Sequence, residues 1–197
     1  QRVPTFALAL EFTTMNNKSV STATIGYMCY ALSFWMIGVF VTGWASGSDA
    51  SIWAIAFPLA VLLLVIGILA CVHGRTLDAI IFFGGFGVLW SAHSLLGLAG
   101  HAAPSEGYLG WFFIVWTVFF AWVFLGALKA GIVRTLFLLA LWLAFLAEAI
   151  SAWGHVHVID IVGGYLYLAT GVLAAIVSAS EIICHGRSGH LNESSAA

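Results

Sequence analysis

The dominant pattern along the chain is a succession of long apolar runs separated by short polar breaks. Each run has the length of a membrane-spanning helix, because a bilayer core about 30 Å thick takes roughly 20 residues of α-helix. The runs are too long for buried strands or for the apolar part of a signal peptide. The pattern predicts six helices, at about residues 23–44, 52–72, 79–100, 109–129, 135–153 and 161–184.

The breaks between these runs contain turn-forming residues and are too short to hold a soluble domain. We therefore expect one all-α integral membrane domain, a six-transmembrane-helix bundle at residues 21–184. A segment of residues 1–20 precedes the bundle, and its first part is a candidate leader. A small, polar tail of residues 185–197 follows the bundle, and we expect it to be frayed.

The basic residues predict the orientation of the bundle. Lys and Arg near helix ends favour the cytoplasm, and all six of them fall on one side of the predicted membrane. They are Arg2, Lys18, Arg75, Lys129, Arg134 and Arg187. The loops on the other side carry acids and histidines instead. We expect a multi-pass protein of the plasma or inner membrane with both termini in the cytoplasm.

The composition excludes several classes of protein. The chain is 62% hydrophobic and 7% charged, whereas a soluble domain has about a quarter of its residues charged. A net charge of −2 gives no reason to expect a nucleic-acid partner. The sequence contains no nucleotide loop and no zinc-protease motif. His101, His155, His157 and Asp160 share one side of the membrane, but loop histidines commonly bind nothing. We assign no catalytic residue, no metal and no cofactor.

Two ionisable residues stand inside predicted spans and are candidate functional residues. His93 lies seven residues below the outer end of its span, and Glu148 lies five below the outer end of another. Ionisable groups at membrane depth are costly and usually face the bundle interior. The two side chains can lie at similar depth and pair. Alternatively, Glu148 reaches the lipid headgroups and His93 bonds a neighbouring helix.

Small residues recur along two of the predicted helices and predict close helix packing. In the third span they are Gly84, Gly87, Ser91 and Ser94, and in the sixth they are Gly164, Gly171, Ala175 and Ser178. We interpret both rows as packing surfaces.

Several motifs between residues 15 and 184 resemble the acetate uptake (succinate–acetate permease) family, which includes the fungal ammonia/acetate proteins. They are FGVLW in the third span, LGW and FLGALK in the fourth, and GGYLYLATG and SASE in the sixth. The family has Asn-Pro-Ala-Pro-Leu-Gly-Leu before its first helix. Here the matching stretch is STATIGY (21–27), which keeps Ala23 and Gly26 and departs elsewhere. This departure bears on substrate preference more than on fold.

The resemblance implies a hexamer in which each protomer has its own pore. It also implies a pore constriction, which falls on Tyr30, Phe86 and Leu141 of this sequence. His93 is seven residues beyond Phe86 and Glu148 is seven beyond Leu141. Because seven residues are nearly two helical turns, each should stay on its partner's face, about 10 Å further out.

The predicted function is therefore transport of small carboxylates, namely acetate and also succinate or formate, with protons and the lipid bilayer as further partners. Backbone N–H groups and hydroxyls at Ser21, Thr22, Thr24 and Gly26 form a candidate anion entry at the start of the first helix. His93 and Glu148 would make uptake proton-coupled or pH-sensitive. Two alternatives are open: a urea or short-chain amide channel, and a non-transporting membrane sensor or assembly protein.

Overall fold

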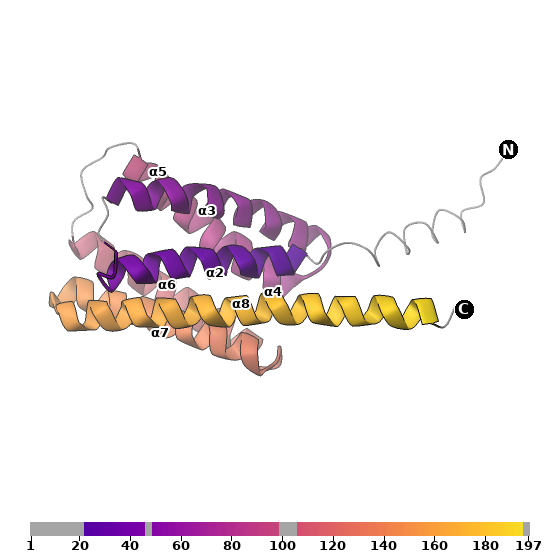
Figure 1. The fold of residues 1–197 in the computed structure, drawn as a ribbon. Helices are drawn as coiled ribbons and strands as arrows, with labels where there is room; N and C mark the ends of the chain where they lie inside the picture. The colour runs from indigo at the N-terminus through magenta and orange to yellow at the C-terminus, as the bar shows by residue number, and fades with distance from the viewer. Residues whose placement is uncertain (1–21, 46–48, 99–105, 195–197) are drawn as a thin grey trace.

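The computed structural model describes residues 22–45, 49–98 and 106–194 (Figure 1). Within this part of the chain all regular structure is helical. The elements are α2 (Thr22–Val41), α3 (Asp49–Val72), α4 (Thr76–Ala79), the π-helix η1 (Ile80–Val88), α5 (Leu89–Leu98), α6 (Glu106–Ala127), α7 (Ile132–Gly154) and α8 (His157–Ser194). Six helical spans in the described residues are long and apolar enough to cross a membrane, with α4, η1 and most of α5 forming the third. The predicted six-helix architecture is confirmed.

The helices run side by side as a bundle, and α2 begins at the end of the bundle beyond which α8 extends (Figure 1). An even number of spans requires this arrangement. Helix α8 continues to Ser194, although the sequence predicted a helix end near residue 184 and a frayed tail. Once a helix is nucleated, each further residue adds a hydrogen bond, so a polar segment can prolong it.

Glycines in the left-handed conformation end two of the spans. Gly43 has φ +74° and Gly74 has φ +70°. Beyond each glycine a backbone N–H reaches back to a carbonyl five residues earlier: Trp44 N bonds Val39 O at 3.0 Å, and Arg75 N bonds Ala70 O at 2.9 Å. This hydrogen-bond pattern is the Schellman motif, which reverses the chain with few residues. The short predicted loops follow from it.

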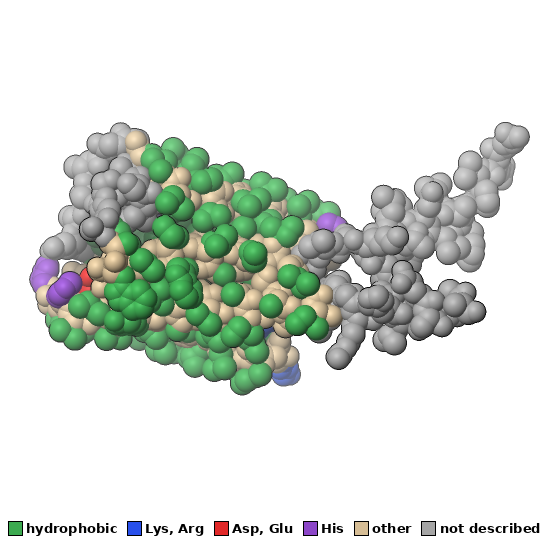
Figure 2. Space-filling model, viewed as in Figure 1, with side chains coloured by type: hydrophobic (Ala, Val, Ile, Leu, Met, Phe, Trp, Pro, Cys, Tyr) green, Lys and Arg blue, Asp and Glu red, His purple; other side chains and the backbone are tan. Residues whose placement is uncertain are grey.

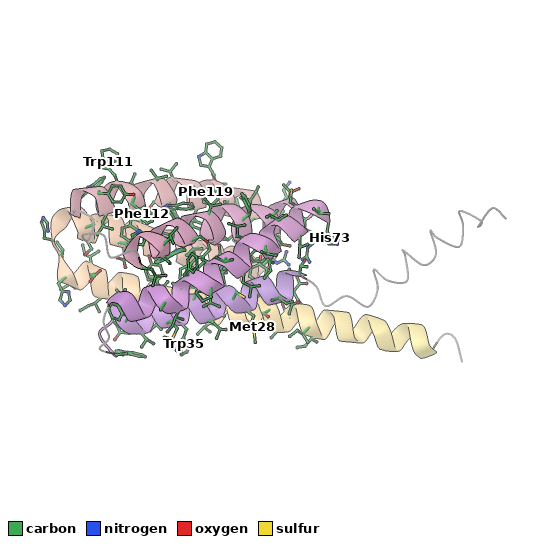
Figure 3. The ribbon with its side chains drawn as sticks, turned by 90° about the horizontal axis from the view of Figure 1, so that it is seen from above. Met28, Trp35, His73, Trp111, Phe112 and Phe119 are labelled. Carbon is green, nitrogen blue, oxygen red and sulfur yellow. The ribbon has the colours of Figure 1, made fainter. Side chains whose placement is uncertain are left out.

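The outer surface of the bundle is apolar. Figure 2 shows hydrophobic side chains over most of the visible face. Met28 and Trp35 of α2 point away from the bundle in Figure 3 and are about half exposed. In water such a surface would be an aggregation hazard, but in a bilayer it is the surface that contacts lipid. The chain is accordingly a multi-pass membrane protein.

The small residues of the last span face α2, as predicted for a packing surface. A Cβ on Gly164 would lie 2.9 Å from the side chain of Thr42, and one on Gly171 would lie 3.1 Å from the backbone of Ala31. Further along, the Ser178 hydroxyl donates to the carbonyl of Thr24 at 2.9 Å. Ala175 instead lines a shallow apolar groove on the outer side of this contact. Helices α2 and α8 thus approach closely along their whole shared length.

The third span differs from the continuous α-helix that the sequence predicted. Its π-helical part bonds each carbonyl to the N–H five residues on and has more residues per turn, so residues three apart do not share a face. Gly84 faces Phe119 of α6, whereas Gly87 faces the backbone of Leu64 in α3. The prediction of a single row of small residues in this span is therefore wrong. The π-helix divides the row between two neighbours.

Candidate functional site

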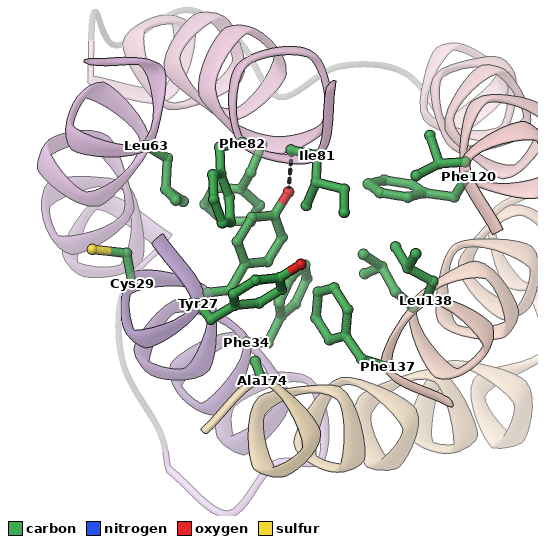
Figure 4. Packing of buried hydrophobic residues seen from close by; sticks show 14 of the residues in the cluster. Tyr27, Cys29, Phe34, Leu63, Ile81, Phe82, Phe120, Phe137, Leu138 and Ala174 are labelled. Carbon is green, nitrogen blue, oxygen red and sulfur yellow. Dashed lines mark hydrogen bonds between the residues drawn. The ribbon is translucent and has the colours of Figure 1, made fainter. Parts of the chain in front are cut away.

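The residues that the resemblance assigns to a constriction lie at the centre of the bundle. Tyr30, Phe86 and Leu141 are all fully buried and belong to one hydrophobic cluster. The rings of Tyr30 and Phe86 are 5.2 Å apart between centroids. Phe34 adds a third ring within 5.5 Å of Tyr30 and 5.2 Å of Phe86. Figure 4 shows side chains of this cluster converging from helices on all sides.

The hydroxyl of Tyr30 is bonded within the protein. It donates to the carbonyl of Ile81 in the π-helix at 2.6 Å, the bond drawn as a dashed line in Figure 4. Gly85 leaves room for this contact, since a Cβ there would lie 3.0 Å from the Tyr30 oxygen. A buried hydroxyl needs such a partner, because an unpaired one is costly in an apolar interior. Tyr30 thereby ties α2 to η1.

A second group of rings lies next to the first, toward the start of α2. Tyr27, one turn before Tyr30, contacts Phe82 at 5.1 Å and Phe137 at 5.6 Å, both edge to face. Phe137 also lies 5.6 Å from Tyr30 and so joins the two groups. The aromatic contacts therefore run without a break from Phe86 through Tyr30 and Phe137 to Tyr27.

A charged cluster follows directly after these rings. The guanidinium of Arg134 lies over the ring of Tyr27, 5.5 Å from its centroid. Arg134 is bonded to Glu181 of α8, and its Nη1 is 4.0 Å from Asp78 of α4. Asp78 is nearly fully buried and pairs with Arg75 at 2.8 Å. It also accepts a hydrogen bond from the Tyr27 hydroxyl at 3.1 Å. Four elements meet in this cluster.

His93 lies on the other side of the constriction, in α5. Its ring contacts two aromatic neighbours, Trp90 at 5.8 Å and Phe112 of α6 at 4.9 Å. Trp90 in turn stacks on Phe86 at 5.2 Å. A line of ring contacts thus connects His93 to the constriction, and the side chain is partly buried.

Glu148 of α7 is buried against α8. A Cβ on Gly163 would lie 2.7 Å from Glu148 Oε1, so the absence of a side chain there makes room for the carboxylate. Asp160 of α8 interacts with Glu148 through its side chain, and both acids act electrostatically on Tyr167. Asp160 also lies 3.9 Å from His157. The pairing of His93 with Glu148 stays a prediction.

The predicted anion entry at the start of α2 is described in part. Ser21 lies outside the described residues. Thr22 is partly exposed and Thr24 is buried, with its carbonyl accepting the hydroxyl of Ser178. Gly26 is covered by the ring of Phe82, which a Cβ at this position would meet at 2.5 Å. The geometry thus gives Gly26 a packing contact, whereas the role of all four residues in anion entry stays a prediction.

Sequence reasoning missed two partnerships between α7 and α8. These helices are antiparallel neighbours across the turn at residues 154–157. Residues equally distant from such a turn lie at the same height, because both helices rise about 1.5 Å per residue. The rule brings both pairs to within about one helical turn: Glu148 lies six residues before the turn and Asp160 three after it, and Arg134 lies 20 before it and Glu181 24 after it. The spacing becomes informative only once α7 and α8 are known to pack against each other.

A comparison with solved structures finds a bundle of the same fold. The bacterial acetate channel SatP superposes with a TM-score of 0.77 at 22% sequence identity, over 84% of this chain and 93% of that chain. No protein-family model and no curated protein sequence matches the chain. The likeness confirms, for the fold, the resemblance that the sequence motifs suggested.

Proposed function

We propose that the chain carries small carboxylates such as acetate across the membrane, through a pathway inside the six-helix bundle. The observation that supports this best is the fold shared with SatP over most of both chains. The central layer of rings at Tyr30 and Phe86 adds support, because it lies at the positions that the sequence resemblance selected. Succinate and formate are further candidate substrates.

The proposed constriction at Tyr30, Phe86 and Leu141 selects for small solutes. All three side chains are buried and none is charged, so a carboxylate crossing this layer must lose most of its water. The one hydroxyl in the layer already donates to Ile81. A small or protonated acid loses less hydration than a large dianion and therefore passes more readily. Entry is assigned to Ser21, Thr22, Thr24 and Gly26, at the start of α2.

Uptake should depend on pH through His93 and Glu148. An ionised Glu148 repels an approaching carboxylate, whereas a protonated carboxyl or a nearby imidazolium removes the repulsion. An unperturbed imidazole titrates near pH 6.5, so a histidine can change its charge within the pH range in which we expect uptake to change. Asp160, Tyr167 and, through Asp160, His157 are the ionisable groups on α8 near Glu148. Transport should therefore increase as the pH falls.

The assembled protein is proposed to be a hexamer, with a pathway in every protomer. The support is the sequence resemblance together with the wide apolar surface of the bundle, part of which would be covered by neighbouring copies. Native mass spectrometry of the purified protein should then give six copies. A monomer in mild detergent would contradict the hexamer and leave the single-protomer pathway unaffected.

The first experiment is uptake of labelled acetate by proteoliposomes from about pH 5 to 8, with unlabelled succinate, formate and urea as competitors. Saturable uptake that increases toward low pH and is blocked by small carboxylates is the expected result. Flux of urea without flux of acetate would instead identify an amide channel. A protein that conducts neither solute would be a membrane sensor or assembly protein.

The variants His93→Gln and Glu148→Gln test the pH dependence. Each keeps a side chain of similar size and removes the titrating group. We expect a flatter pH profile in both, with acetate uptake by Glu148→Gln less inhibited at pH 8. An unchanged profile in both variants would reject the role of these residues without affecting the transport assignment.

A further inference from the structure

The guanidinium of Arg134 stands where the central rings end. From Phe86 the ring contacts lead through Tyr30 and Phe137 to Tyr27, and Arg134 lies over the ring of Tyr27. Arg134 belongs to the first turn of α7, at the end of the bundle that the basic residues predict to be cytoplasmic. A solute that follows these rings inward therefore meets this cation next.

The hydrogen-bonding capacity of Arg134 is only partly used. A guanidinium has five N–H donors and can bind a carboxylate with two parallel bonds. Among the described residues one acceptor bonds it, the Oε1 of Glu181. Asp78 is 4.0 Å from Nη1, which is an ion-pair distance and too long for a hydrogen bond. Donors remain for a further carboxylate.

The two acids near Arg134 are held in different ways. Asp78 is buried and fixed by Arg75 at 2.8 Å and by the hydroxyl of Tyr27 at 3.1 Å. Glu181 lies near the end of the apolar part of α8, and its side chain is 20% exposed. The carboxylate of Glu181 therefore reaches water, whereas Asp78 is enclosed by its partners. Its carboxylate is chemically equivalent to acetate.

We propose that Arg134 is a carboxylate-binding site at the inner end of the pathway, which Glu181 occupies until a small carboxylate substrate displaces it. This inference rests on the proposed function and adds to it the cation that the predicted entry at the start of α2 lacks. Asp78, fixed by Arg75 and Tyr27, keeps the guanidinium in position during the exchange. The resident Glu181 lowers the affinity for substrate, which allows release to the cytoplasm.

The test compares the half-saturating acetate concentrations of the full-length protein and three variants in proteoliposomes. Acetate is supplied on the side of the membrane that the predicted cytoplasmic end of the bundle faces. Arg134→Gln should raise that concentration about tenfold or more, since a charge-assisted bond to the substrate is lost. Glu181→Gln should lower it about fivefold, because an amide competes less well than a carboxylate for the guanidinium. Lys129→Gln is the matched control.

Lys129 is a suitable control because it removes one positive charge at the same end of the bundle from an exposed position. It should leave the half-saturating concentration within about twofold of wild type, since an exposed cation is well screened. Equal effects of Lys129→Gln and Arg134→Gln would mean that general surface charge matters, and would overturn the proposal. An unchanged value in Glu181→Gln would overturn it as well, even if Arg134→Gln does not fold.

Binding measured apart from flux separates this inference from the proposed function. The signal of ¹³C-labelled acetate should broaden with the wild-type protein in detergent and broaden much less with Arg134→Gln. Acetate binding that depends on Arg134, without acetate flux, would reject the transport function and retain the site. Acetate flux with equal binding by both proteins would retain the transport function and reject the site.

Discussion

At the scale of a residue, the hydroxyl oxygen of Tyr30 has a structural role of its own, separate from that of the aromatic ring. The layer of rings around it needs aromatic volume, which phenylalanine would supply equally well. The hydroxyl adds a bond to the carbonyl of Ile81 and so fixes the position of α2 relative to the π-helix. Because both groups are buried, the bond has no competition from water. The same bond makes this hydroxyl unavailable as a donor to a substrate.

Replacing Tyr30 with phenylalanine should lower the free energy of unfolding by about 1 kcal/mol, the usual net value of one buried hydrogen bond. Thermal or denaturant unfolding in detergent measures the change. Tyr165→Phe serves as the control because its ring is half exposed at the lipid-facing surface. Equal stability of Tyr30→Phe and wild type would mean that the Tyr30 hydroxyl contributes nothing to the fold.

At the scale of elements, the contact between α3 and the π-helix is so close that a side chain larger than glycine would meet backbone atoms at Gly67 and at Gly87. A Cβ on Gly67 would lie 2.7 Å from the Cα of Phe83, and one on Gly87 would lie 2.8 Å from the Cα of Leu64. Backbone atoms cannot move aside as the end of a side chain can. The two glycines, one on each element, therefore set the distance between these helices.

Gly67→Ala should destabilise the protein by about 2 kcal/mol, within the usual range for overpacking. The control is Gly126→Ala in α6, where a Cβ would meet nothing within 4 Å. Alanine is the better helix former by about 1 kcal/mol, so that variant should be as stable as wild type or more stable. Unfolding temperatures in detergent compare the two, and equal losses would contradict the role given to the α3–η1 contact.

The sequence predicts these elements to different degrees. The spans follow from apolar runs of membrane length, and the turn glycines mark where α2 and α3 end. The π-helix was not predictable, because the segment IIFFGGFGV is apolar or small throughout and no polar residue reveals how many residues make a turn. The resemblance assigns Tyr30 and Phe86 to a constriction inside the bundle, and both side chains are buried there. The partners of Glu148 and Arg134 required knowledge that α7 and α8 are neighbours.

At the scale of the whole molecule, the six spans bring the start of α2 and the end of α8 to one end of the bundle (Figure 1). Lys129 and Arg134 lie at this end as well, at the turn between α6 and α7. Basic residues on one side only are the usual determinant of orientation. The predicted topology has both chain ends in the cytoplasm.

Reporter fusions test this topology. Alkaline phosphatase attached after residue 197 should be inactive, because it folds only outside the cytoplasm, whereas a fluorescent protein attached there should be bright. A phosphatase fusion truncated after residue 155, in the turn between α7 and α8, should be active. The opposite pattern would invert the bundle and assign the Arg134 cluster to the outer face.

The π-helix also affects how the third span responds to a change in chain length. An α-helix turns about 100° per residue, so removing one residue after Phe86, at the end of η1, would rotate everything beyond the deletion by about that angle. The inner half, with Asp78 and the bond from Tyr30, would keep its place, while α5 would present another side to α6. Because η1 has more residues per turn than an α-helix, such a deletion is more easily accommodated here. Single-residue insertions and deletions after Phe86 are thus a simple route by which His93 is turned toward or away from the pathway while the constriction keeps its place.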